Sequence, residues 1–127
     1  MSRRSCAPSP GQLPLVFDLF AVPNDSGVYL ECEKLSFSSK GGRPSAEIRI
    51  ANAPFGFCWG TQVMFSAGGF AHMPNEKDLQ SGEFASTRTD ALRRACASIL
   101  RRIGGDQVGG GAKEVAAVRA WVEGLCA

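Results

Sequence analysis

The most regular pattern of apolar and polar positions lies between residues 87 and 103. Five small or apolar residues recur there at spacings that place them on one face of a helix: Leu92, Ala95, Cys96, Ile99 and Ile103. Thr87 can cap the first turn, with Asp90 three positions later, and Gly104 can end the helix. This pattern predicts a long amphipathic helix with its apolar face on a core.

A second, weaker helical pattern follows near the end of the chain. Val115, Val118, Val122 and Leu125 share a face at helical spacing, which predicts a helix over 112–123. Between the two helices, residues 104–111 are mostly glycine, so we expect a mobile hinge there.

Shorter apolar runs upstream predict strands. They cover 13–22, 28–37, 46–50 and 57–66, and 83–85 is a candidate fifth strand. The second run changes phase after Cys32, which predicts a bulge near Glu33 and Lys34. A hairpin centred near Gly41 would place Glu33 opposite Arg49.

The region after residue 66 is richer in turn and polar residues. We expect Gly68 and Gly69 to turn the chain, and residues 72–82 to form a polar connection, with a short extended piece around Phe70. Strands followed by helices are typical of the segregated α+β class. The sequence therefore predicts a single α+β domain over 13–127, an antiparallel sheet of four to five strands packed against a long helix, and a disordered tail over 1–12.

Composition agrees with a small soluble domain. The chain has 127 residues, of which 44% are hydrophobic and 20% charged, enough for one core. No apolar segment before Leu13 resembles a signal peptide or a membrane span, so we expect a cytoplasmic protein with no membrane partner. Its five cysteines, at 6, 32, 58, 96 and 126, are an odd number without close pairs, which favours reduced thiols.

Positive charge is concentrated in the long helix. Residues 88–103 contain five arginines and one aspartate, whereas the net charge of the whole chain is only +2. The candidate partner-binding residues are therefore Arg88, Arg93, Arg94, Arg101 and Arg102. They suit phosphate of DNA or RNA, or an acidic patch on another protein; the alternative is that they only keep the outer helix face solvated.

Other chemistries have little support in the sequence. One histidine, His72, and five scattered cysteines do not make a zinc pattern, and no phosphate-binding glycine motif joins a strand to a helix. Phe57 and Trp59 resemble the aromatic residues on the RNA-binding strand of RNA-recognition domains, but we expect them to pack in the core. We therefore expect no metal, no cofactor and no catalytic activity.

The stretch from Trp59 to Leu100 carries a pattern of a Trp-Gly pair, a Gly-Gly pair, a later proline, an aromatic residue, a Ser/Thr-Arg step and a helix beginning with Ala-Leu. The matching residues are Trp59, Gly60, Gly68, Gly69, Pro74, Phe84, Thr87, Arg88, Ala91 and Leu92. In this pattern the stretch resembles a small uncharacterised accessory domain of plasmid and phage genes in proteobacteria.

The resemblance implies a protein that accompanies mobile elements. We therefore expect a non-catalytic binding protein, such as an anti-defence inhibitor of the anti-CRISPR type, that binds a host protein complex in the bacterial cytoplasm. The alternative is an accessory protein that binds DNA or RNA directly through the arginine-rich helix. A homodimer formed through an unpaired strand edge is also open.

Overall fold

The computed structural model describes residues 20–54, 56–80, 82, 84–104 and 109–126. Its elements, in chain order, are β1 (Glu33–Ser38), β2 (Ser45–Ala53), β3 (Gly56–Phe65), β4 (Gly68–His72), α1 (Glu76–Gln80), α2 (Arg88–Ile103) and α3 (Ala112–Leu125). Across this part of the chain, no helix has the length and apolar character needed to span a membrane.

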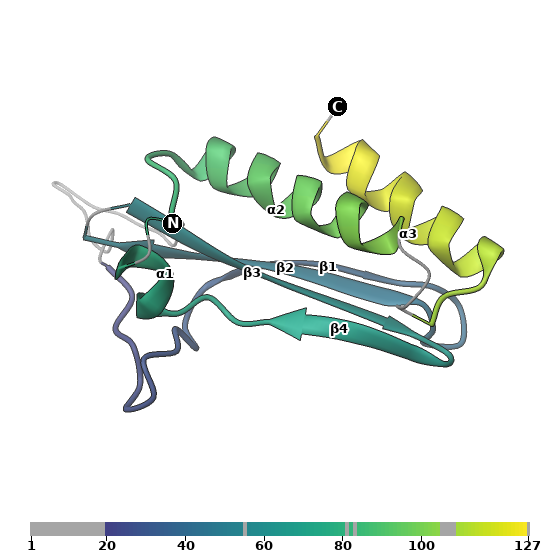
Figure 1. Ribbon diagram of the computed structural model, residues 1–127, viewed down its shortest axis with the longest axis horizontal. Coiled ribbons are helices and arrows are strands. Elements are labelled where there is room, and N and C mark those ends of the chain that lie inside the picture. The colour runs from purple at the N-terminus through teal and green to yellow at the C-terminus, as the bar shows by residue number, and fades with distance from the viewer. Residues whose placement is uncertain (1–19, 55, 81, 83, 105–108, 127) are drawn as a thin grey trace, which may run out of the picture.

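The strands form one antiparallel sheet in the order β1-β2-β3-β4, so each strand pairs with its neighbour in sequence. The helices α2 and α3 lie together over one face of this sheet, and α1 lies near the end of β4 (Figure 1). This arrangement confirms the predicted α+β class, with four strands in the described sheet.

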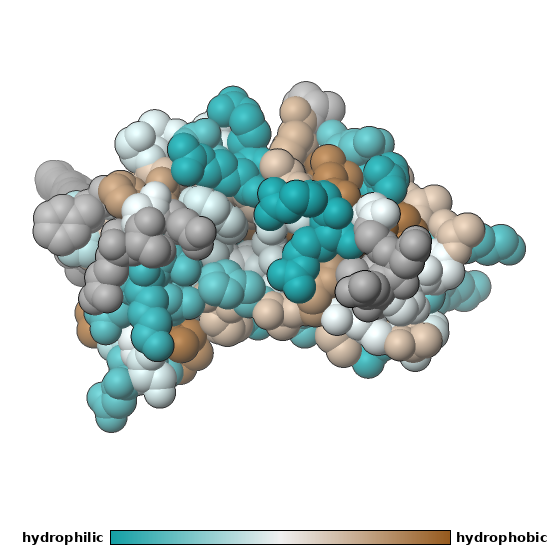
Figure 2. All heavy atoms as spheres, viewed as in Figure 1, coloured by the Kyte–Doolittle hydropathy of each residue, from teal (hydrophilic) through white to brown (hydrophobic). Residues whose placement is uncertain are grey.

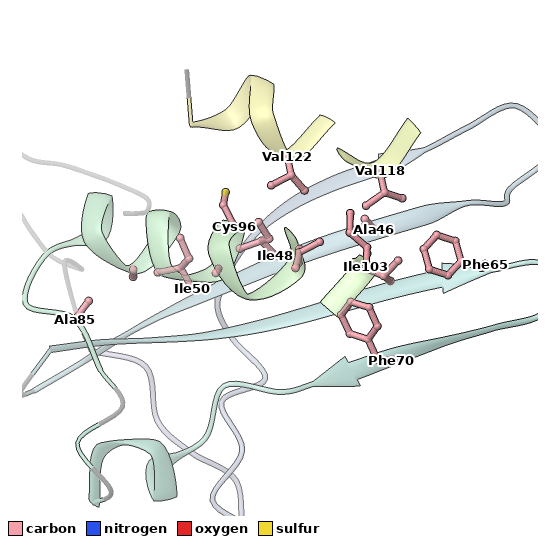
Figure 3. Packing of buried hydrophobic residues seen from close by; sticks show 14 residues of the cluster. Ala46, Ile48, Ile50, Phe65, Phe70, Ala85, Cys96, Ile103, Val118 and Val122 are labelled. Carbon is pink, nitrogen blue, oxygen red and sulfur yellow. The ribbon is translucent and has the colours of Figure 1, made fainter. Parts of the chain in front are cut away.

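The main core lies between the sheet and the two long helices. Ile48 and Val63 from the sheet meet Ile99 of α2 and Val118 of α3, all of them fully buried. Figure 3 shows side chains of this cluster, among them Ile48 of β2 and Val118 of α3. Burial of each such side chain stabilises the fold by about 1.5–3 kcal/mol. The predicted apolar face of α2 is confirmed, except that Leu92 is only partly buried while Ala91 is completely buried.

A second, smaller core lies on the opposite face of the sheet. Residues 20–32 run across that face, below the sheet in Figure 1, and Tyr29 packs there with Ala51, Ala53 and Cys58. The N–H of Tyr29 donates a hydrogen bond to the carbonyl oxygen of Pro74 at 2.9 Å, which fixes the segment to the chain beyond β4.

The start of α2 is capped as predicted. The Thr87 hydroxyl accepts a hydrogen bond from the N–H of Asp90 at 3.0 Å. The helix ends before Gly104, whose φ of −76° is right-handed, so this glycine is not used as a left-handed cap. The prediction for α3 is confirmed too, and the helix continues two residues further, to Leu125.

Several predicted strand boundaries are wrong. The strand expected over 28–37 begins only at Glu33, because Val28 forms an isolated bridge with Asn75 instead, and no bulge is needed. Glu33 lies opposite Ile50, and Arg49 lies opposite Lys34. The hairpin loop has an even number of residues, so its midpoint falls between Gly41 and Gly42 and the register shifts by one position from the predicted one.

The turn after β3 also differs from the prediction. Ser66 and Ala67 make the turn, while Gly68 and Gly69 already belong to β4. At Gly69 a Cβ atom would lie 2.2 Å from the carbonyl oxygen of Val63, so a close strand approach explains this glycine. The extended piece expected around Phe70 is thus a paired strand, and the region expected to be a polar connection contains the short helix α1.

Three other predictions lie wholly or partly outside the described residues. The tail over 1–12 is outside completely, as are residues 13–19 of the first expected strand and residues 105–108 of the expected hinge. Residues 20–22 are described and are not in a strand, although the N–H of Ala21 donates to the carbonyl oxygen of Asn52. Of the expected strand over 83–85, Glu83 is not described and Ala85 forms an isolated bridge with Phe57.

Candidate functional site

A groove runs between α2 and the β3–β4 side of the sheet, with α1 at one end. It has a volume of about 450 Å³, and we call it the α2–β4 groove. Its lining comes from five parts of the chain: Trp59, Thr61, His72, Asp78, Gly82, Arg94, Ala97, Ser98, Arg101 and Arg102. Hydrophilic side chains gather over the middle of the corresponding face of the molecule (Figure 2).

The floor of the groove is set by strand geometry. Trp59 and Thr61 are two positions apart on β3, so both point to the face that carries α2. His72 of β4 is the cross-strand partner of Thr61, which brings it onto the same face. Trp59 is partly buried and packs against the core, as predicted, but it also lines the groove.

The wall of the groove is α2 from Arg94 onward. Arg94, Ser98 and Arg102 are each four residues apart, and Arg101 is three residues after Ser98, which places all four along one side of the helix. The Arg94 guanidinium lies 5.9 Å from the centre of the Trp59 ring, and Nε of Arg94 is 3.1 Å from a carboxylate oxygen of Asp90.

The last two arginines of α2 have no acidic partner among the described residues. The guanidinium of Arg102 lies 4.5 Å from the centre of the Phe70 ring, a cation–π arrangement that leaves its N–H groups unpaired with any described carboxylate. Arg101 is exposed and makes no hydrogen bond or ion pair with that part of the chain. As far as the described residues go, two guanidinium groups can therefore contact a ligand where the groove meets the C-terminal end of α2.

His72 and Asp78 form a pair beside this wall. Nε2 of His72 is 3.2 Å from Oδ2 of Asp78, and Asp78 is buried. Within the described chain, no hydroxyl or thiol lies within hydrogen-bond distance of the His72 ring. The pair therefore fixes the histidine at the edge of the groove without forming a nucleophile–base arrangement.

Thr61 is a buried polar residue of the groove. Its side chain lines the groove although the residue is only 5% exposed, and the described residues offer its Oγ1 no hydrogen bond. An unpaired buried hydroxyl costs about 1–3 kcal/mol, so a ligand that bonds to it would recover part of that energy.

The structure divides the five predicted site arginines into two groups. Arg94, Arg101 and Arg102 line the groove. Arg88 donates from Nε and from its terminal nitrogen to the carboxylate of Glu33, and these hydrogen bonds raise the pKa of the guanidinium. Arg93 lies 3.5 Å from Asp90 and does not line the groove.

Sequence reasoning missed Thr61, His72 and Asp78 as parts of the same site. A signal for Thr61 was present, because it is the single polar residue on a strand face otherwise made of Phe57, Trp59, Val63 and Phe65. His72 and Asp78 were expected in a polar connection, and only the pairing of β4 with β3 and the turn of α1 bring them to the groove.

The described residues contain no group of three or more His, Cys, Asp or Glu side chains that could hold a metal ion. A scan of the sequence against family models found no match, and searches among curated proteins and solved structures found no significant similarity.

Proposed function

We propose that this chain is a non-catalytic binding protein that holds nucleic acid through the α2–β4 groove. The observation that carries this proposal is the position of Arg101 and Arg102, two guanidinium groups without a described acidic partner, beside the aromatic floor of the same groove. Planar guanidinium groups bind phosphate oxygens in a bidentate manner, and binding several phosphates releases counterions.

The balance of charge in the groove supports an anionic ligand. Among the described residues, three arginines line it and Asp78 is the single carboxylate in its lining. The carboxylate of Asp78 is already held by His72, and that of Asp90, outside the lining, lies beside Arg93 and Arg94. The described acidic groups nearby therefore contact the histidine and the upstream arginines, and none of them contacts Arg101 or Arg102.

Fluorescence anisotropy with a labelled oligonucleotide tests this proposal. We expect binding at low salt that weakens as salt rises, and Arg101→Gln or Arg102→Gln should reduce the slope of log K against log salt by about 0.7–0.9 per lost phosphate contact. Lys113→Gln removes the same charge from an exposed position on α3 and is the matched control. Absence of binding at low salt, or equal slopes for all variants, would overturn the proposal.

A second candidate function is inhibition of a host protein complex, as in anti-CRISPR proteins. Three large apolar side chains close together in sequence support it, because Phe20, Val22 and Leu30 are 53%, 74% and 58% exposed. Exposed apolar side chains are typical of surfaces that bind proteins, and β1 adds a sheet edge without a strand partner among the described residues.

Co-purification from a host lysate distinguishes this candidate. An inhibitor of this kind should retain a protein partner at high salt, and Phe20→Ser with Leu30→Ser should release that partner while leaving nucleic-acid affinity unchanged. Recovery of no partner at any salt concentration would remove this candidate. We place both activities in the cytoplasm, where the thiols of the chain stay reduced.

A further inference from the structure

We infer that the α2–β4 groove selects single-stranded over duplex nucleic acid, because it accepts one unpaired base on the ring of Trp59. This inference rests on the proposed function and adds the form of nucleic acid that the site recognises. It is carried by the position of Trp59 in the lining of the groove, the guanidinium of Arg94 over its ring, and the hydroxyl of Thr61, which has no partner among the described residues.

The aromatic floor is recessed. Trp59 and Thr61 belong to β3, an inner strand of the sheet, and α2 lies over the same face. A duplex can offer phosphates to the exposed arginines, but its bases are stacked inside the helix and their faces do not reach a recessed ring. An unpaired base can leave its stack and lie on an aromatic side chain, which is how proteins commonly bind single strands.

The size of the groove fits one nucleotide unit. Its volume of about 450 Å³ lies within the usual range for small-ligand sites. From Arg94 to Arg101 the helix rises by about 10 Å, at 1.5 Å per residue. A strand that lies along α2 can therefore place its phosphates near Arg101 and Arg102 while one base enters beside Arg94.

Arg94 and Trp59 are placed to hold that base from both sides. The guanidinium is 5.9 Å from the ring centre. A flat base between them requires two stacking distances of about 3.4 Å each, roughly 1 Å more than the present separation. Arg94 is half exposed and is held by Asp90 on the same helix and by a long hydrogen bond of 3.4 Å from its guanidinium to the carbonyl oxygen of Phe84. Binding of the base would exchange this long hydrogen bond for stacking and keep the contact with Asp90.

Thr61 supplies the polar contact at the bottom of the groove. Its hydroxyl can both donate and accept, and it has no hydrogen-bond partner among the described residues. His72, its cross-strand neighbour, lies beside it with Nε2 on Asp78. A base stacked on Trp59 therefore has hydrogen-bonding groups at its edge, whereas the paired bases of a duplex do not reach these groups.

Tryptophan fluorescence provides a direct test. In a Trp121→Phe background, Trp59 is the remaining tryptophan, and the replacement preserves an aromatic ring against Phe37. An oligonucleotide of about 12 nucleotides, a length within the site sizes of small single-strand binders, is titrated as a single strand and as a duplex. We expect the single strand to quench Trp59 and to bind at least about 10-fold more tightly than the duplex.

Two substitutions separate stacking from phosphate binding. Trp59→Leu should weaken single-strand binding by roughly 5- to 150-fold, the usual effect of losing one stacked base, and leave duplex binding unchanged. Thr61→Val keeps the approximate shape of a buried side chain and removes a hydroxyl that is unpaired among the described residues. We therefore expect weaker single-strand binding together with an equal or higher thermal unfolding midpoint. If Trp59→Leu does not fold, the fluorescence titration and Thr61→Val still decide the question.

The outcomes distinguish this inference from the proposed function. Equal affinity for single strand and duplex, without quenching of Trp59 but with the expected dependence on Arg101, would overturn the inference and leave the proposed function standing. Binding of neither form would overturn both. Selective single-strand binding that quenches Trp59 and weakens in Thr61→Val would support both.

Discussion

Nε of Arg88 donates a hydrogen bond to Oε1 of Glu33 at 2.7 Å, and a terminal nitrogen of the same guanidinium donates to Oε2. The pair joins the first residue of α2 to the first residue of β1. It also removes one of the five helix arginines from the set available to a ligand.

We expect Arg88→Gln to lower the free energy of unfolding by about 0.5–1 kcal/mol, because the pair is bidentate but nearly half exposed to solvent. Nucleic-acid affinity should not change. Urea denaturation and anisotropy on the same variant measure the two effects. A loss of affinity as large as that of Arg101→Gln would show that Arg88 contacts the ligand.

The cap of α2 gives a second stability prediction. Thr87→Ala should lower the free energy of unfolding by about 1 kcal/mol, since the N–H of Asp90 loses its acceptor. Thr89→Ala is the matched control, because Thr89 is an exposed residue inside the same first turn and makes no hydrogen bond with its side chain among the described residues. Equal effects of the two changes in denaturant melts would contradict the capping role.

Gly60 allows β4 and the chain after it to approach β3. A Cβ atom there would lie 2.4 Å from the carbonyl oxygen of His72 and 2.5 Å from Cδ of Pro74. We expect Gly60→Ala to cost about 1–3 kcal/mol of stability by overpacking, and to weaken nucleic-acid binding by displacing His72. Gly124→Ala, on α3 with nothing within 4 Å of the added methyl group, should instead be neutral or stabilising in thermal melts.

The thiols differ in reactivity. Burial raises the pKa of Cys58 to about 11, and burial together with a hydrogen bond to Cys126 raises that of Cys96 to about 12. Since the thiolate is the reactive form, both should resist alkylation near neutral pH, whereas the exposed Cys126 should react before either of them. Mass spectrometry of peptides after timed iodoacetamide treatment, with a urea-unfolded sample as control, checks this order.

A pH dependence is expected where α3 meets the β3–β4 turn. The hydroxyl and N–H of Ser66 both donate to Glu114, at 2.7 and 3.0 Å, and the hydroxyl is the main cause of the lowered pKa of this carboxyl group. A lowered folded-state pKa stabilises the fold above the unfolded value and ceases to do so as the pH falls through the folded value. Glu114→Gln should therefore be less stable than the parent chain at neutral pH, and the difference should shrink under acid, as urea melts at several pH values would show. A difference independent of pH would contradict this account.

The elements that the sequence predicted well are those in which local signals agree. In α2, the spacing of Ile99 and Ile103, the cap at Thr87 and the end at Gly104 all point to the same helix, and tertiary contacts only add to it. The register of the first hairpin depended on whether its loop has an odd or even number of residues, which Gly41 and Gly42 together leave ambiguous.

The groove could not be predicted from local sequence patterns, for a different reason. Its arginines could be placed on α2 from their spacing, but the sequence could not separate Arg88, which binds Glu33 across a gap of 55 residues, from Arg101. His72 reaches the groove through a strand that begins with two glycines, residues that usually mark a turn. Contacts of this kind, between residues far apart in sequence, depend on how all the strands of the sheet pair.

The direction of α2 has a consequence for how the groove attracts its ligand. Arg101 and Arg102 lie in the last turn, where the backbone carbonyls carry partial negative charge. Proteins more often cradle anions at the opposite end of a helix, where amide hydrogens assist. Here the peptide backbone opposes a phosphate and the side chains alone attract it, so a chain without these two guanidinium groups should no longer attract anions at this end of the helix.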